Sequence, residues 1–182
     1  MSFTKKTLNV AVLVALGGAM TQGAFAADGT INFTGEITDA TCSISPSSQN
    51  LTVPLGKVAK TVLNGAAGKK SAAANFTIDL LDCPATAKNA TVAFTGVADA
   101  VNKDDLRIAN AGQVGVSAAT GVAVQLGDST GTQIAVNGLP SAEYKLGEGA
   151  NSLKFQAQYV STGAAVTVGP ANTSAQFTVA YK

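Results

Sequence analysis

The last nine residues of the chain, SAQFTVAYK (174–182), carry the pattern that decides the fold. Ala175, Phe177, Val179 and Tyr181 alternate along this stretch with smaller or more polar residues. The period of two predicts a β-strand with one apolar face. The end of a chain is usually polar and loosely held unless it is tied into a sheet. A strand in this place therefore raises the question of what pairs with its second edge.

The rest of the sequence reads as further short strands separated by Gly, Asn, Asp and Pro. The strongest lies within SLKFQAQYVST (152–162), where Leu153, Phe155, Ala157 and Tyr159 share one face. No segment has a helical period over the length that a stable helix needs. Many short strands with turn residues between them predict an all-β sandwich. The other expected strands are 29–45, 51–63 with an edge or a bulge at Pro54, 75–83, 90–96, a short one at 106–109, 121–129 and 132–138.

The first residues of the chain have the composition of an export signal. Lys5 and Lys6 precede an apolar stretch at 8–20, and Ala24 and Ala26 stand at the small-residue positions before a cleavage site. A membrane anchor is the alternative, but the apolar stretch is short for a bilayer span. The expected organisation is a signal peptide at 1–26, an N-terminal extension at 27–38 and a single domain at 39–182.

The composition offers few groups for catalysis or for binding nucleic acid. Of the 182 residues 46% are hydrophobic and 13% are charged, and the formal net charge is +1. Histidine is absent and Arg107 is the one arginine, which removes the Ser-His base, the usual zinc or copper ligands and a basic nucleic-acid patch. GAAGKKS (65–71) lacks the glycine spacing of a phosphate-binding loop, and Asp104-Asp105 reads as a solvated turn. We therefore expect no enzyme activity, no cofactor, no metal and no nucleic-acid partner.

Two cysteines, Cys42 and Cys83, follow the expected export signal. An even count in an oxidising compartment predicts one disulfide. The bridge would close a loop of about 41 residues and stabilise the fold by about 4 kcal/mol in the chain-entropy model. A redox or metal pair is the alternative, which the missing CxxC spacing and the lack of histidine disfavour.

Both ends of the chain resemble subunits of the chaperone–usher pathway. Gly169 is the fourteenth residue from the C-terminus and Tyr181 is the penultimate one, with the alternating strand between them, as in the C-terminal motif of these pilins. The paired end motifs are specific, whereas the strands between them are generic. The stretches that resemble type 1 fimbrial major subunits are FQAQYVSTGAAVTVGPANTSAQFTVAYK (155–182), GTINFTGEITDATC (29–42) and FTIDLLDC (76–83).

The resemblance implies an incomplete immunoglobulin-like sandwich that lacks its last strand. In this family a periplasmic chaperone first lends a strand to the open groove, and the N-terminal extension of a neighbouring subunit then replaces it. Pairing of 29–37 within its own subunit is the alternative that the residues alone leave open. The implied groove and chaperone-binding residues are Gly169, Ala175, Phe177, Val179, Tyr181 and Lys182, and the implied donor-strand residues are Ile31, Phe33, Gly35 and Ile37.

The resemblance leaves two classes of function in competition. One is a structural shaft subunit, a homopolymer that is exported through the periplasm, delivered by a chaperone to an outer-membrane usher and assembled at the cell surface by donor-strand exchange. The other is a minor or adaptor pilin, or a ligand-binding pilin at the fibre tip. A two-domain tip adhesin needs a longer chain and lacks a donor extension of its own. The sequence therefore favours the shaft subunit.

Overall fold

The structure is a computed structural model, and it describes residues 32, 34–35, 42–115 and 117–182. The chain divides into two compact units, Met1–Thr38 and Asp39–Lys182, and the helices and strands described below belong to the second. Among the described residues, no helix is long and apolar enough to cross a membrane.

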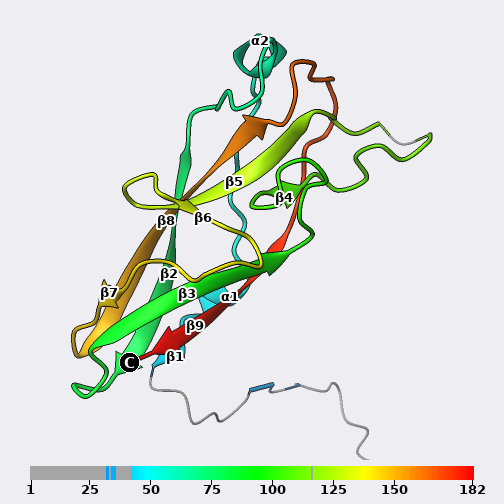
Figure 1. The fold of residues 1–182 in the computed structure, drawn as a ribbon. Helices are drawn as coiled ribbons and strands as arrows, with labels where there is room; N and C mark the ends of the chain where they lie inside the picture. Colours follow the sequence, from blue (N-terminus) through cyan, green and yellow to red (C-terminus); the bar gives the residue numbers. More distant parts are fainter. Residues whose placement is uncertain (1–31, 33, 36–41, 116) are drawn as a thin grey trace, which may run out of the picture. The chain divides into compact units, whose positions relative to one another are not determined.

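Two antiparallel sheets make up the second unit (Figure 1). The larger has six strands in the order β1-β2-β8-β5-β4, with β6 also paired to β5, and the smaller has the order β7-β3-β9. The strands of the larger sheet are β1 (Ser43–Ile44), β2 (Ala74–Cys83), β4 (Leu106–Arg107), β5 (Val122–Asp128), β6 (Gln133–Ile134) and β8 (Gly149–Ser161). Those of the smaller sheet are β3 (Asn89–Gly96), β7 (Tyr144–Lys145) and β9 (Ala175–Tyr181). The predicted all-β class is confirmed, since the helices α1 (Pro46–Gln49) and α2 (Lys60–Leu63) have only four residues each.

The alternation of β8 sets which face of the larger sheet is buried. Leu153, Phe155, Ala157 and Tyr159 are buried, as their spacing predicts, whereas the residues between them are half-buried or exposed. β2 pairs with one side of this strand and β5 with the other. The strongest sequence pattern therefore marks the middle of the main sheet.

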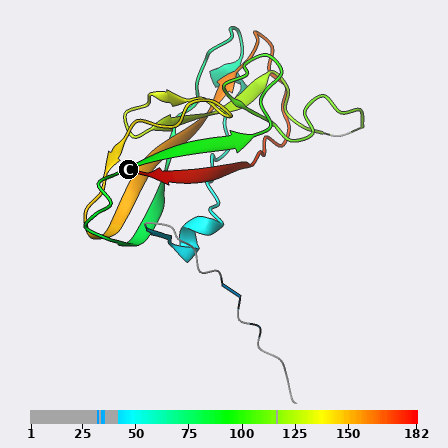
Figure 2. The ribbon, with the colours of Figure 1, turned by 60° about the horizontal axis from the view of Figure 1, so that its bottom comes forward.

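Aromatic rings join the two sheets. Phe94 of β3 meets Phe155 of β8 edge to face with ring centroids 5.3 Å apart, and Phe76 of β2 stacks on Phe155 at 5.6 Å. Each such pair contributes about 0.5–1.5 kcal/mol beyond the area that it buries. β9 lies beside β3 in register and is the edge strand of its sheet (Figure 2).

The connection between β1 and β2 differs from its predicted strand. The alternation at 51–63 predicts a strand, but 50–59 join no sheet and α2 follows directly. Pro46 opens α1, which turns the chain off the edge of β2, and Pro54 has no N–H to donate to a ladder. Among the described residues, the expected strand at 132–138 is reduced to β6, because only Gln133 and Ile134 pair with the edge of β5.

Candidate functional site

A groove of about 1190 Å³ opens beside β9, on the side away from β3. Its floor is apolar and comes from both sheets, with Ile78 of β2, Leu126 of β5 and Phe94 of β3 among the residues that form it. One wall is β9 with the residues that precede it, and the other is the segment 51–56, called here the 51–56 wall. Such a trough suits an extended segment of chain better than a compact small molecule.

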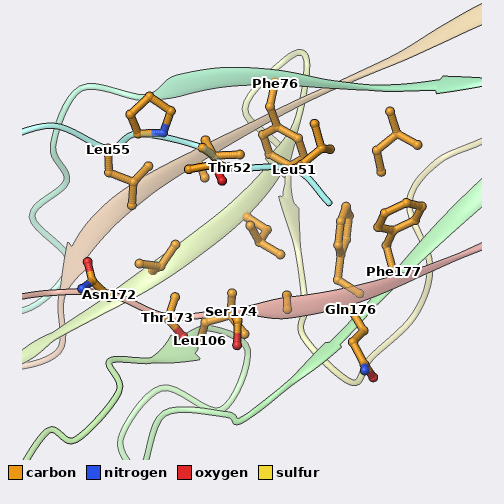
Figure 3. Close-up of a pocket in the computed structure, with 18 of the residues that line it drawn as sticks. Leu51, Thr52, Leu55, Phe76, Leu106, Asn172, Thr173, Ser174, Gln176 and Phe177 are labelled. Atoms are coloured by element: carbon orange, nitrogen blue, oxygen red, sulfur yellow. The ribbon is translucent and has the colours of Figure 1, made fainter. Parts of the chain in front are cut away.

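The two walls present apolar side chains toward each other (Figure 3). Leu51 and Leu55 stand on the 51–56 wall, and Phe177 stands on β9, whose neighbour Gln176 points away from the groove. Phe177 is only half-buried, although its ring belongs to the apolar face of the strand. The apolar face of β9 is thus covered by the core on its inner side and open toward the groove.

The hydrogen bonds of Lys182 show which residues of β9 bond to β3 and which direct their main-chain groups away from it. Lys182 donates its N–H to the Asn89 carbonyl at 2.9 Å, and Asn89 donates back to the Lys182 oxygen at 3.1 Å. In an antiparallel pair such doubly bonded residues alternate with residues whose main-chain groups point outward. The residues with outward N–H and C=O groups are therefore Ala175, Phe177, Val179 and Tyr181. All four were predicted to be groove residues, and their apolar side chains are half-buried or exposed. Ala175 and Phe177 line the groove, whereas Val179 and Tyr181 lie on the same free edge beyond its lining. The predicted residue Lys182 also lies beyond the lining.

The main chain of the opposite wall is also unpaired. Within the part of the chain that the structure describes, residues 50–58 make no main-chain hydrogen bond. Leu51 is 40% exposed, and Val53 and Leu55 are half-buried toward the groove. Sequence reasoning missed this wall because its alternation was interpreted as a strand with an edge or a bulge at Pro54, whereas residues 50–59 join no sheet.

A smaller cavity of about 430 Å³ continues the groove toward α2, and it is called here the upper cavity. The two spaces share Gly56, Tyr159 and Ala171 in their linings, while Lys57 and Lys60 line only the upper cavity. Exposed lysines thus stand at one end of a groove whose own lining residues carry no charge.

Gly169, a predicted groove residue, lies at the upper cavity and not beside the main groove. A Cβ atom at this position would come within 2.7 Å of the Ala118 carbonyl carbon and of the Ala119 nitrogen. The next residue, Pro170, accepts the Ala119 N–H at 2.9 Å. A close crossing of two chain segments therefore accounts for glycine here, and this crossing shapes the wall of the upper cavity.

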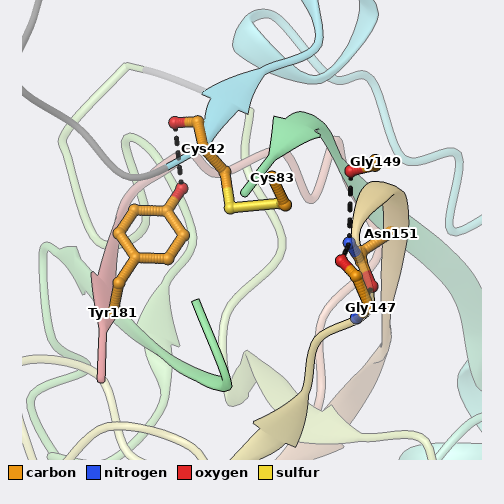
Figure 4. Close-up of a disulfide and its surroundings, with 6 residues drawn as sticks. All are labelled: Cys42, Cys83, Gly147, Gly149, Asn151 and Tyr181. Carbon is orange, nitrogen blue, oxygen red and sulfur yellow. Dashed lines mark hydrogen bonds between the residues drawn. A yellow bond between two sulfur atoms is a disulfide. The ribbon is translucent and has the colours of Figure 1, made fainter. Parts of the chain in front are cut away.

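The disulfide and the last aromatic residue lie together at the lower end of β9, beyond the residues that line the groove (Figure 4). Cys42 and Cys83 form the predicted disulfide, with their Cα atoms 4.4 Å apart. Tyr181 donates its hydroxyl to the Cys42 carbonyl at 3.4 Å, and burial raises the pKa of Tyr181. The disulfide thus fixes the start of the domain beside the end of β9.

Lys182 is held at this lower end by main-chain and side-chain contacts. Its oxygen accepts the N–H groups of Lys88 and Asn89, both at 3.1 Å, and its Nζ lies 2.5 Å from Glu143 Oε1. The predicted donor-strand residues are nearly all outside the described part of the chain, which includes only Gly35 among them. Ile31, Phe33 and Ile37 lie outside the described residues.

Asp105 differs from its sequence expectation, because its side chain is completely buried and does not lie in a solvated turn. Its carboxylate accepts hydrogen bonds from the side-chain amides of Gln133 at 2.9 Å, Gln125 at 3.4 Å and Asn102. Burial raises the pKa of Asp105 to about 6, and the charge of Asp104 raises it further while the Gln125 hydrogen bond lowers it. Among the described residues, no cluster of three metal-ligating side chains is found. Asp105 is therefore a buried acid of the fold, outside the groove.

Known proteins with similar sequences and structures are fimbrial. The family described as fimbrial protein matches residues 31–182. The probable major fimbrial subunit LpfA of Escherichia coli O157:H7 is 42% identical over 181 residues, which are 99% of this chain and 98% of that protein. The fimbrial subunit type 1 of Klebsiella pneumoniae is 40% identical over 97% of this chain and 98% of its own length. The solved structure of a chaperone-usher pilus, described for its rod uncoiling, is 28% identical with a TM-score of 0.70 over 86% of this chain and 96% of that chain.

Proposed function

The chain belongs to the fimbrial protein family, and from this premise we propose that its groove accepts a donor strand from a neighbouring subunit. The resemblance identified from the two ends of the sequence is confirmed. A member of this family is a structural subunit of a pilus and not an enzyme. The chain therefore polymerises with other subunits into a surface fimbria.

The observation that carries the proposal is a groove with unpaired main chain along both of its walls. β9 directs the N–H and C=O groups of alternate residues into it, and residues 50–58 make no main-chain hydrogen bond among the described residues. A strand inserted between the walls would bond to both and cover the apolar floor. Each main-chain hydrogen bond would contribute about 0.5–1.5 kcal/mol, and each fully buried Ile or Phe about 1.5–3 kcal/mol.

The extension before the domain has the composition of such a strand. Ile31, Phe33 and Ile37 alternate with polar residues, and Gly35 occupies the remaining position on the same face. The stretch 31–37 has seven residues, the same length as β9. We include this segment in the proposal as the donor strand.

The open groove also gives a physical reason for a carrier during export. An unpaired strand edge beside an exposed apolar floor favours association with other chains and aggregation. We include in the proposal a periplasmic chaperone that covers the groove after removal of residues 1–26, and an outer-membrane usher that receives the complex. Both partners follow from the family resemblance.

Enlarging one donor residue tests the donor role. Glycine inside a strand usually marks a close approach by another chain, so Gly35→Leu should overfill the site opposite it at a cost of about 1–3 kcal/mol. The matched control is Thr34→Leu, which introduces the same side chain on the opposite face. Both variants should be exported and oxidised at Cys42 and Cys83, but only Gly35→Leu should lose fibres in electron micrographs. Normal fibres from Gly35→Leu would refute the donor role.

A further inference from the structure

The end of the domain around α2 carries positive charge and no carboxylate. It is formed by residues 57–70, 117–122 and 160–170. Main-chain hydrogen bonds hold these segments together, and in one of them Gly65 donates its N–H to the Ala164 carbonyl at 2.7 Å. The charged residues of these three segments are Lys57, Lys60, Lys69 and Lys70. The one ion pair within the described chain is at the opposite end, between Lys182 and Glu143. The four lysines thus concentrate uncompensated positive charge beside the upper cavity.

Two of these lysines line the upper cavity, which continues the groove. They are Lys57 and Lys60, whereas Lys69 donates its Nζ to the Asn64 carbonyl at 2.8 Å and Lys70 bridges to Val160 in the sheet. Lys57 is exposed and the next residue, Val58, is half-buried, so the lysine stands on the outer side of the wall. An occupant of the groove that ended in acidic residues would therefore meet these two side chains.

The extension has that charge pattern. Residues 27–38, with the first three residues of the domain (39–41), contain Asp28, Glu36 and Asp39 and no lysine or arginine. Asp28 precedes the apolar residues of the proposed donor strand, Glu36 lies between Gly35 and Ile37, and Asp39 follows them. The C-terminal end of the extension is therefore its more acidic end.

We propose that Lys57 and Lys60 of one subunit form an ionic clasp with Glu36 and Asp39 of a second copy, a proposal that rests on the donor-strand function above. If Ile37 of the second copy is directed into the groove, Glu36 would face outward and could meet Lys57. Asp39, two residues beyond Ile37, would share its face and could meet Lys60 at the upper cavity. The clasp fixes both the register and the direction of the donor strand.

The direction follows from where each end of the groove lies. β9 begins at Ala175, three residues after Asn172, which lines both the groove and the upper cavity, and it ends at Tyr181, beside Cys42. A donor with its acidic C-terminal end at the lysines is antiparallel to β9. Cys42 of the second copy is three residues after Asp39, which is at most about 11 Å of extended chain. In the proposed arrangement, the start of the second copy's domain, at Cys42, therefore lies close to the α2 end of the first copy.

Charge reversal and its repair test the clasp in the full-length chain. The variants are Lys57→Glu with Lys60→Glu, Glu36→Lys with Asp39→Lys, and all four changes together. The measurement is the fraction of oxidised subunit that is recovered in fibres sheared from cells. Replacing two partly exposed attractions by repulsions should lower this fraction about tenfold in either double variant, and the combined variant should return to within about threefold of wild type. A combined variant no better than either double variant would overturn the clasp.

Further variants test whether the effect depends on these positions and on the direction of the donor strand. Lys154→Glu makes the same charge change in the middle of β8, and Asp28→Lys changes the other end of the extension. Both should assemble like wild type, and a tenfold loss from Asp28→Lys would contradict the antiparallel direction. If the reversed lysines prevented folding, Lys57→Gln with Lys60→Gln should still lower assembly about threefold, and an unchanged yield would count against the clasp.

The remaining outcomes separate the clasp from the donor-strand function. If every charge-reversed variant gave the wild-type yield of fibres, the clasp would be refuted and donor-strand exchange would be retained. If the wild-type chain itself formed no fibres, both proposals would be refuted. A third outcome is that the reversals change only the stability of a monomer, independently of protein concentration. That result would show that the extension occupies the groove of its own subunit, and it would refute the pairing between copies.

Discussion

A pair of proline substitutions in β9 separates its two main-chain edges. Thr178 is doubly bonded to β3 according to the hydrogen-bond phase fixed by Lys182, whereas Val179 directs its N–H toward the groove. Proline removes the N–H and is tolerated in a strand only where that group faces away from the sheet. Thr178→Pro should therefore destabilise the subunit by about 2–4 kcal/mol, because it removes a ladder hydrogen bond and leaves a carbonyl of β3 without its donor, while Val179→Pro should leave the fold intact.

The effect of Val179→Pro on an incoming strand can be estimated from the same edge. The variant loses one main-chain hydrogen bond, worth about 0.5–1.5 kcal/mol, and leaves a carbonyl of the donor strand without its partner at a cost of about 1–3 kcal/mol. The total of about 2–4 kcal/mol corresponds to a loss of strand affinity of roughly 30- to 1000-fold.

The assay compares both variants with wild type for two quantities, the yield of oxidised soluble subunit and the yield of fibres. Val179→Pro should give normal subunit and few fibres, and Thr178→Pro should give little subunit. Normal fibres from Val179→Pro would show that β9 is not the acceptor edge. Equal loss of subunit from both variants would show that the assigned hydrogen-bond phase is wrong.

Three further predictions concern the disulfide, the buried acid and the last aromatic residue. Replacing Cys42 and Cys83 by serine should lower the free energy of unfolding by about 4 kcal/mol, measured by denaturant titration. The pKa of Asp105 is raised to about 6 in the folded state, so the free energy of unfolding should increase as the pH falls from about 7 toward 4, by at most about 3 kcal/mol. Asp105→Asn should remove this pH dependence. Tyr181→Asp should abolish co-purification with the chaperone, because it places a charge on the groove edge; unchanged capture would contradict the assignment.

The sequence predicts the paired parts of the fold well and the unpaired parts poorly. The alternation of β8 gave its buried face correctly, because the middle of this strand packs in the core, and the alternation of β9 gave the face whose Phe177 and Val179 are half-buried against the core. The same reasoning failed at 51–63, because alternation reports which side chains face the core and not whether the main chain has a partner. Asp105 was missed because its burial depends on amides of Gln125 and Gln133, which are distant in sequence.

The candidate site was predictable in its β9 half only. Val179 and the alternate residues on either side of it identify an apolar strand face. The resemblance to fimbrial subunits implies that the free edge of this strand accepts a donor strand. The upper cavity depends on a crossing of Gly169 with Ala118 and Ala119, which no local pattern reveals. Lys57 and Lys60 gain their position only through that crossing and the path of the 51–56 wall.

A map of the assembled fibre at side-chain resolution would show what occupies the groove. We expect an added strand between β9 and the 51–56 wall, formed by residues 29–37 of a neighbouring subunit and antiparallel to β9. Phe33 and Ile37 should point onto the apolar floor, and Glu36 should lie beside Lys57. An empty groove, or one filled by the extension of the same subunit, would contradict the account.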